Sequence, residues 1–343
     1  MTDDQVMRTA LHTVVSGADL DRATARCAMD TIMEGSATPA QIGALLAALR
    51  TKGETVDEIC GMVDSMRAHA TSVRLERDAV DTCGTGGDGS FTFNISTAAA
   101  LVAAGAGAPV AKHGNRAASS RCGSADVLEA LGVAISLPPA GVAACVDEAG
   151  MGFFFAPAYH PAMRHAGPVR SDLGIRTVFN VLGPLANPAR VRRQALGVAD
   201  PAMAPLMAGV LQRLGHERAL VFSGAGGIDE LGLQGPSRCF QVTPDGVTED
   251  EIDPASLGFA PATTADLRGG DAGENAARVR AVLDGEQGAA RDVVLLNAAA
   301  ALVASGTAPT LDDGVRRAAD AVDSGAARTV LDRLIAVSNR SWT

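Results

Sequence analysis

Aromatic side chains and positive charge are both scarce in this chain of 343 residues. Aromatic residues make up 3% of the sequence, and the formal net charge at pH 7 is −10. Nucleic acids and anionic membranes favour basic surfaces, so an acidic chain has no general attraction for either, and any anion site must be local. Because hydrophobic residues make up 47%, we expect a core of small aliphatic side chains, as helices packed on a sheet allow.

The chain also lacks paired cysteines and long apolar segments. Its six cysteines lie far apart with no C-x-x-C pair, which argues against a disulfide framework or a zinc cluster. The first residues contain no basic region followed by an apolar one, and no uncharged apolar run of about 18 residues occurs. We therefore expect a cytoplasmic protein with no membrane or nucleic-acid partner.

Two amphipathic helices with clear start signals lie in the first part of the chain. A capping box at 38–41, with proline at the first helical position, precedes an apolar stripe over residues 42–49. A second capping box at 55–58 precedes a stripe over residues 59–66. We expect a small helical domain over residues 1–75. Two short helices in a small domain have few internal partners, so we also expect the stripes to form a self-associating surface, most simply a homodimer.

Short apolar strands alternate with alanine-rich helices in the rest of the chain, which is the pattern of a mostly parallel sheet. Strands are predicted at 79–82, 109–112, 152–156, 194–198 and 218–223. Helices are predicted at 96–104, 124–131, 139–149, 201–214, 273–283, 291–304 and 311–338, with an irregular surface segment at 253–270. The predicted fold class is α/β, with a small N-terminal helical domain plus a larger domain, residues 76–343, whose mostly parallel central sheet is flanked by helices.

A glycine-rich turn over residues 81–88 follows the first predicted strand, and residues 94–97 then open a helix with a Ser-Thr cap. A strand, a glycine loop and a helix N-terminus together aim N–H groups at one point, which suits a phosphate. A tight turn without a ligand is the alternative, but four glycines flanked by Asp81 and Asp88 favour the ligand. Neither G-x-x-x-x-G-K-[ST] nor G-x-G-x-x-G is present, so the turn does not indicate ATP or dinucleotide binding.

A second polar loop follows the predicted strand at 109–112. Its cations, hydroxyls and amide lie at the carboxyl end of a strand, where open α/β sheets bind ligands: Lys112, His113, Asn115, Arg116, Ser119 and Ser120. We expect Lys112 to be a partly exposed phosphate contact and His113 to donate to phosphate. Ser124 is expected to cap the next helix. A solvated loop is the competing interpretation.

Two further clusters carry charge. Asp229 and Glu230 follow the predicted strand at 218–223, and adjacent carboxylates at a strand end suit Mg²⁺ shared with a substrate phosphate, although such pairs are commonly solvated. Four arginines in a basic segment offer a fork for a substrate carboxylate, or else solvated surface groups: Arg170, Arg176, Arg192 and Arg193. His160 and His165 are not at the i, i+4 spacing of a zinc site.

The chain resembles the anthranilate phosphoribosyltransferase family of tryptophan biosynthesis. The resemblance rests on motifs in order along nearly the whole chain: residues 81–88, 94–97, 112–126, 160–170, 174–188 and 227–231. It implies a helical domain that carries the dimer contact, joined by parts of 165–190, and an α/β domain whose strand ends hold 5-phosphoribosyl 1-pyrophosphate (PRPP). It also implies two Mg²⁺ ions, one of them brought with PRPP.

The resemblance also implies individual site residues. For PRPP they are Gly84, Gly87, Asp88, Thr92, Asn94, Ile95, Ser96, Thr97, Lys112, His113, Gly114, Asn115, Arg116, Ala117, Ala118, Ser119, Ser120 and Ser124. Asn115 and Arg170, with the backbone at Gly84, would orient anthranilate, and Ser96, Asp229 and Glu230 would bind Mg²⁺. The chain differs from many relatives at Ala118 and at 121–122.

Two other functions are compatible with parts of this pattern. A pyrimidine nucleoside phosphorylase has a similar architecture, but the Asn115-Arg116 continuation and the Asp229-Glu230 pair favour the transferase. A noncatalytic relative that binds an anion or nucleic acid is the second alternative, and the net charge argues against nucleic acid.

Overall fold

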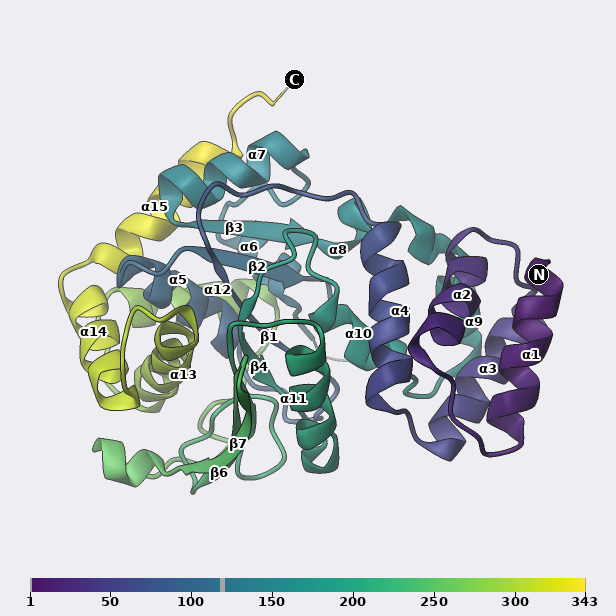
Figure 1. Cartoon of the computed structure of the whole chain (residues 1–343). Helices are drawn as coiled ribbons and strands as arrows, with labels where there is room; N and C mark the ends of the chain where they lie inside the picture. The colour runs from purple at the N-terminus through teal and green to yellow at the C-terminus, as the bar shows by residue number, and fades with distance from the viewer. Residues whose placement is uncertain (1, 118–120, 343) are drawn as a thin grey trace.

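The computed structural model describes residues 2–117 and 121–342, and it has a helical part beside a larger α/β part (Figure 1). The helical part contains α1 (Asp3–Val15), α2 (Arg22–Met33), α3 (Pro39–Lys52) and α4 (Val56–Ala68). Later in the chain, α9 (Gly167–Leu173) packs against α3, and α10 (Phe179–Leu185) packs against α4. The short helix α8 (Ala156–Tyr159) and a 3₁₀ turn, Pro161–His165, lead into α9.

Both predicted capping boxes are present in the helical part. Thr38 and Gln41 exchange hydrogen bonds at the start of α3, and Thr55 and Glu58 do so at the start of α4. The apolar stripes at 42–49 and 59–66 are fully buried within this one chain. Their partners include the helix α11 (Ala204–Arg213), which lies on the sheet and packs against α4. The argument that these stripes remain free for self-association was therefore wrong, because it counted only partners inside the small domain.

The central sheet has seven strands in the order β3-β2-β1-β4-β5-β6-β7. The strands are β1 (Val80–Gly84), β2 (Val110–Gly114), β3 (Met151–Phe155), β4 (Arg193–Gly197), β5 (Arg218–Ser223), β6 (Ser237–Thr243) and β7 (Gly246–Ile252). The first five in sequence run parallel, as predicted, whereas β6 and β7 are antiparallel. Sequence analysis missed both strands. For β7 the reason is that it is an exposed edge strand rich in acidic residues, which suits an edge but hides the apolar pattern of a strand.

Helices cover both faces of the sheet (Figure 1). One hydrophobic cluster contains residues of α5 (Ile95–Gly105), α6 (Ser124–Ala130), α7 (Pro139–Ala144), α12 (Ala272–Leu283), α13 (Ala289–Ser305), α14 (Leu311–Asp323) and α15 (Ala326–Ser338). A second hydrophobic cluster contains residues of α11 and of the helical part. The buried faces of α5 and α13 consist mainly of alanine, leucine and valine, so the expected core of small aliphatic side chains is present.

Two predicted segments differ in detail from the structure. The helix predicted over 311–338 is two helices, because Gly325 adopts a left-handed φ of 75° between α14 and α15. The segment 253–270 is irregular apart from a 3₁₀ turn, Pro254–Leu257, but it is not purely surface: Leu267 is buried and its carbonyl accepts from the Phe93 N–H at 2.9 Å. Within the described residues, no helix has both the length and the apolar character needed to cross a membrane.

Candidate active site

The sheet has a topological switch point between β1 and β4. From β1 the chain moves outward to β2 and β3, whereas β4 leads to β5 on the other side. Open α/β sheets bind ligands at such a point, beyond the carboxyl ends of the strands. Gly84 ends β1 and is paired in register with Gly197, which ends β4. Both predicted loops and the acidic pair therefore emerge at this edge of the sheet.

Asp229 lies directly across the ends of β1 and β4. A Cβ on Gly84 would collide with the Asp229 carboxylate, and a Cβ on Gly197 would collide with the Asp229 main-chain carbonyl. The Gly86 N–H donates to Asp229 Oδ2 at 2.7 Å. Glycine at positions 84 and 197 is thus what allows the loop after β5 to close on the glycine turn.

The glycine turn is held from a third direction by Arg176. Gly86, Gly87 and Gly89 all adopt left-handed φ angles of 68° to 72°, which L residues rarely adopt. Arg176 Nη1 donates to the carbonyls of Gly86 and Gly87 at 2.8 and 2.9 Å, and it occupies the space that a Cβ on Gly87 would need. Arg176 was expected as a possible carboxylate fork, but its guanidinium binds the protein backbone instead.

Three carboxylates converge beside this turn: Asp88, Asp229 and Glu230, which we call the acidic cluster. Glu230 Oε1 accepts from the Ser96 N–H at 3.0 Å, at the first turn of α5. Burial raises the pKa of Asp229, and the nearby Asp88 charge raises it further. Burial also raises the pKa of Glu230, with Asp229 as the next cause. Carboxylates that repel one another in this way are stabilised by a cation between them.

The donors of the acidic cluster fit Mg²⁺. They are carboxylate oxygens, with the Ser96 hydroxyl beside them, and hard oxygen ligands are what Mg²⁺ binds. Within the part of the chain that the structure describes, no group of three or more acidic, histidine or cysteine side chains is arranged so that it could hold a metal ion by itself. An ion there would complete its shell with water and substrate phosphate, as Mg²⁺ commonly does.

Lys112 is buried beside this site. It is 2% exposed, so the expectation of a partly exposed contact was wrong. The reason is that β2 is an inner strand, between β3 and β1, and Lys112 points into the protein. Its Nζ donates to the Thr82 carbonyl and to Ser96 Oγ, the latter at 3.2 Å. Lys112 therefore fixes the Ser96 hydroxyl and places a buried positive charge near the acidic cluster.

His113 is buried and neutral. Burial lowers its pKa to about 3, and burial lowers that of His160, whose ring centroid lies 5.2 Å away, to about 4. His113 Nδ1 lies 3.1 Å from the Gly183 carbonyl, which can only accept, so Nδ1 carries the proton. The other ring nitrogen, Nε2, is then an acceptor, and it has no partner among the described residues. The expected role of His113 as a donor to phosphate was therefore wrong.

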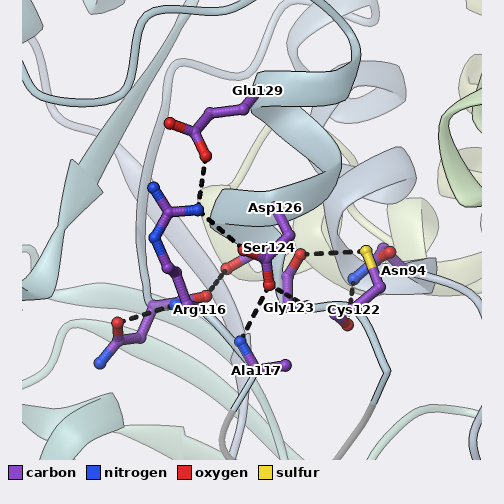
Figure 2. Close-up of polar contacts among 9 residues, drawn as sticks. Asn94, Arg116, Ala117, Cys122, Gly123, Ser124, Asp126 and Glu129 are labelled. Atoms are coloured by element: carbon purple, nitrogen blue, oxygen red, sulfur yellow. Dashed lines mark hydrogen bonds and ion pairs between the residues drawn. The ribbon is translucent and has the colours of Figure 1, made fainter. Parts of the chain in front are cut away.

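The loop after β2 is closed by Asp126 (Figure 2). Asp126 Oδ2 accepts from the N–H groups of Ala117 and Gly123 at 3.0 and 2.8 Å, one at each end of the loop. Arg116 Nη1 binds Asp126 Oδ1 at 2.9 Å and also pairs with Glu129. Sequence analysis gave Asp126 no role of its own; its position in the first turn of a helix after glycine was the available signal.

Ser124 does not cap α6 as predicted. Gly123 is the N-cap and Ser124 is the first helical residue, with its Oγ donating to the Asn115 carbonyl at 3.2 Å. Asn115 is exposed. Its Oδ1 accepts from the Arg116 N–H, and its Nδ2 makes no hydrogen bond within the described residues. Ala118, Ser119 and Ser120 lie outside the described residues.

The start of α5 also differs from the prediction of a Ser-Thr cap. Asn94 is the N-cap, and its side chain makes no cap hydrogen bond. Instead, its Nδ2 donates to the Cys122 carbonyl at 3.2 Å, which ties α5 to the second loop (Figure 2). Ile95 and Thr97 are buried, so only their main chain can face a ligand. Thr92 is half-buried and forms an isolated bridge with Arg268.

The basic segment is spread over two ends of the molecule. Arg170, on α9, stacks over the Phe179 ring with its Cζ 5.0 Å from the ring centroid, and it has no carboxylate partner within the described residues. Burial lowers the pKa of its guanidinium. Arg192 and Arg193 lie instead at the amino end of β4, where both pair with Glu217. Their inclusion in a substrate fork with Arg170 was therefore wrong.

Residues 8–70 match the helical bundle domain of the glycosyl transferase family, and residues 76–328 match its a/b domain. The fold and the site thus define a glycosyl transferase of this two-domain class. Anthranilate phosphoribosyltransferase from a Roseiflexus species is 57% identical over 97% of this chain and 98% of its own length. The crystal structure of the Thermus thermophilus enzyme has a TM-score of 0.92 at 45% identity, over 96% of this chain and 99% of that one.

A second similar structure is the Saccharomyces cerevisiae anthranilate phosphoribosyltransferase in complex with PRPP and Mg, with a TM-score of 0.89 at 26% identity over 98% of each chain. This chain belongs to the anthranilate phosphoribosyltransferase family.

Proposed function

We propose that this protein transfers the phosphoribosyl group of PRPP to the amine of anthranilate, giving N-(5-phosphoribosyl)anthranilate and pyrophosphate in tryptophan biosynthesis. The observation that carries the proposal is the acidic cluster, packed against a glycine turn at the switch point of the sheet. Family membership points to the same reaction. The loops around this cluster are the ones on which the predicted PRPP residues lie.

The donor substrate would occupy the carboxyl ends of β1 and β2. Breaking the bond between ribose C1 and the pyrophosphate oxygen develops positive charge on the sugar and negative charge on the leaving group. Asp229 and Glu230 would hold a Mg²⁺ ion there, which when bound would supply positive charge against the pyrophosphate. Lys112 fixes the Ser96 hydroxyl beside these carboxylates. Arg176 keeps the glycine turn in the conformation in which its remaining N–H groups face the substrate.

The acceptor would lie where α9, α10 and β2 meet. Arg170 is a half-buried cation without a carboxylate partner in the described chain, so it matches the carboxylate of anthranilate. His113, on the neighbouring strand, is buried next to this place, and its Nδ1 is held by the Gly183 carbonyl of α10. Asn115 completes the positioning. The C1–N bond would form as the C1–O bond to pyrophosphate breaks, and the proton lost by the amine would pass to the departing pyrophosphate or to water. Positioning of the amine in line with C1, rather than a strong base, is then the main contribution.

We also propose a cytoplasmic homodimer that uses two Mg²⁺ ions, one carried by PRPP. A reducing compartment is supported by five cysteines that form no disulfide in the described chain: Cys27, Cys60, Cys83, Cys145 and Cys239. The dimer contact is assigned to the helical part, where Val15 and Ile175 are large apolar side chains left exposed. Light scattering should report twice the chain mass, and Ile175→Asp should shift it toward the monomer. A wild-type monomer at micromolar concentration would reject the assignment.

The reaction is tested by the loss of anthranilate fluorescence with purified protein, Mg²⁺ and PRPP. We expect the loss to need all three and to release one pyrophosphate for each anthranilate consumed. Thymidine with phosphate is the parallel arm, and free thymine released there without anthranilate consumption would make the protein a nucleoside phosphorylase. Consumption of neither substrate pair by folded protein would make it a noncatalytic relative.

A further inference from the structure

A pocket rich in arginine lies at the amino end of the sheet, opposite the candidate active site. It has a volume of about 440 Å³, within the range of small-molecule sites. Three chain segments form it: residues 72–79 before β1, residues 188–193 before β4, and Glu217 before β5. We call it the arginine pocket, and its five arginines are Arg74, Arg77, Arg190, Arg192 and Arg193.

The charges of the arginine pocket are unbalanced. Its lining contains two carboxylates, Asp78 and Glu217, against five guanidinium groups. Both carboxylates are already engaged: Glu217 pairs with Arg192 and Arg193, and Asp78 lies 3.5 Å from Arg193. No ion pair to Arg74, Arg77 or Arg190 is formed within residues 2–117 and 121–342. Three guanidiniums thus share one pocket without counter-charge, although the chain as a whole is strongly acidic.

Parts of the arginine pocket are held rigidly. Arg190 adopts a left-handed φ of 51°, which is uncommon for a residue with a Cβ. Its N–H donates to the Asn187 carbonyl at 2.9 Å, and its Nη2 donates to the Arg67 carbonyl at the end of α4 at 3.0 Å. On the other side, Arg193 Nη1 donates to the Ser305 carbonyl at 2.8 Å. Two of the guanidiniums are therefore oriented before any ligand arrives, which lowers the entropy cost of binding.

Part of the pocket lining is apolar. Val73, Ala79 and Val191 are buried and Leu75 is half-buried, and all four line the pocket together with the arginines. A lining that combines cations and apolar side chains matches a molecule that has an anionic end and an apolar body. Arginine forks bind phosphate oxygens in pairs, and several forks around one cavity favour several linked phosphates over a single carboxylate.

We propose that the arginine pocket is a binding site for a small molecule that carries two or more linked phosphate groups, such as a nucleoside diphosphate, and that it is separate from the active site. Because the arginine pocket lies at the amino end of the sheet and the candidate active site at the carboxyl end, the proposal does not depend on the identity of the transferase substrates.

The test uses isothermal titration of the full-length wild-type protein with ADP, inorganic tripolyphosphate and adenosine. We expect ADP and tripolyphosphate to bind and adenosine not to bind, with affinity falling as salt is raised. Because PRPP also carries linked phosphates, the active site is separated by substitution rather than by competition: Gly87→Ala, which disturbs the glycine turn of the active site, should leave the ADP titration unchanged. Adenosine binding alone, failure of ADP and tripolyphosphate to bind at millimolar concentration, or loss of ADP binding in Gly87→Ala would each overturn the proposal.

Charge reversal locates the site. Arg74→Glu with Arg77→Glu changes two exposed arginines that make no described ion pair, so the fold should survive, and a circular-dichroism melt checks this. We expect the affinity for ADP to fall at least about tenfold. The matched control, Arg8→Glu with Arg316→Glu, makes the same change of net charge at side chains that are 73% and 70% exposed on α1 and α14. An equal loss of ADP affinity in the control would show that the effect comes from net charge alone, and it would overturn the assignment of the site to the arginine pocket.

An acidic peptide is the other anion that such a surface attracts, and hexaglutamate provides the comparison. The arginine pocket is assigned to linked phosphates, so hexaglutamate should bind more weakly than tripolyphosphate. Tighter binding of hexaglutamate that the Arg74→Glu, Arg77→Glu variant abolishes would make the pocket a protein-docking surface and contradict the proposal.

Discussion

The two ends of the central sheet collect opposite charges. At the carboxyl end, Asp88, Asp229 and Glu230 converge in a partly buried acidic cluster that raises the pKa of its own members. At the amino end, the arginine pocket gathers guanidiniums that are mostly exposed and only partly paired. The net charge of −10 describes neither end. The comparison teaches that local charge without a counter-charge marks a binding site. The charges are buried in the acidic cluster, which is proposed to assist bond cleavage, and exposed in the arginine pocket, which is proposed only to bind a ligand.

The largest expected effect comes from removing the charge at the carboxyl end. Asp229→Asn with Glu230→Gln should lower turnover by about 10² to 10³, because the metal contact to pyrophosphate loses its charge. Initial rates across a Mg²⁺ titration measure this, and a thermal melt should show that the fold survives. Wild-type rates at every Mg²⁺ concentration would mean that the acidic cluster does not hold the ion.

Arg170→Ala tests whether an unpaired cation away from the acidic cluster is also a substrate contact. A charged hydrogen bond contributes about 1.5–3 kcal/mol, so the Michaelis constant for anthranilate should rise about 10- to 100-fold while that for PRPP stays nearly constant. Arg170→Lys should recover only part of the loss, because a point charge cannot form a bidentate contact. Arg164→Ala, at an exposed neighbour, is the control. Unchanged anthranilate kinetics in Arg170→Ala would place the acceptor elsewhere.

The glycine turn offers a matched pair of substitutions. Gly87 and Gly89 have φ angles of 71° and 72°, but only at Gly87 would a Cβ meet Arg176; at Gly89 it would enter open space. Alanine at either position costs about 1 kcal/mol of backbone strain. Gly87→Ala should in addition displace Arg176 and raise the Michaelis constant for PRPP about tenfold beyond the Gly89→Ala value. In an Arg176→Ala background, Gly87→Ala and Gly89→Ala should have the same Michaelis constant for PRPP. Equal kinetics of Gly87→Ala and Gly89→Ala when Arg176 is present would show that Arg176 does not order the turn.

The last expected effect is on stability and not on catalysis. Asp229 and Glu230 have pKa values raised in the folded state, so the folded state binds more protons than the unfolded state above the usual carboxyl pKa of about 4. Their contribution to the free energy of unfolding therefore falls as pH rises from about 4 through the raised values, by about 2 kcal/mol. Denaturant titrations of the wild type and Asp229→Asn, Glu230→Gln at pH 5 and pH 8 isolate this term. Relative to the wild type, the variant should be more stable at pH 8 than at pH 5. Addition of Mg²⁺ at pH 8 should raise the stability of the wild type. A difference between the two proteins that does not change with pH would contradict the burial of these charges.

The sequence predicts the features whose signals are local, both at the carboxyl end of the sheet and in the helical part. The glycine turn, the capping boxes at Thr38 and Thr55 and the five parallel strands all depend on neighbours in the chain, and all are present. The roles of Arg176 and Lys112 were not predictable in this way. Arg176 is 90 residues from the carbonyl of Gly86, and Lys112 is buried because β2 is an inner strand, which only the order of the strands decides.

The amino end shows the opposite situation. Arg192 and Arg193 stood out as a basic pair, but the sequence grouped them with Arg170, because all three fall in one basic segment. The structure separates them, since β4 carries its first residues to the amino end of the sheet while α9 returns to the helical part. Arg74 and Arg77 belong to a linker with no pattern of its own. Charge clusters assembled from several segments therefore escape sequence analysis even when each arginine is visible.

The central claim is that the carboxyl end of the sheet binds PRPP through Mg²⁺ held by the acidic cluster. The most direct test is isothermal titration of the wild type with PRPP, with Mg²⁺ present and with EDTA in its place. Strong binding with Mg²⁺ that weakens at least about tenfold with EDTA, and a dependence on Mg²⁺ that disappears in Asp229→Asn, Glu230→Gln, are the predicted results. Equal PRPP affinity with Mg²⁺ and with EDTA, or an unchanged Mg²⁺ dependence in the variant, would contradict the claim.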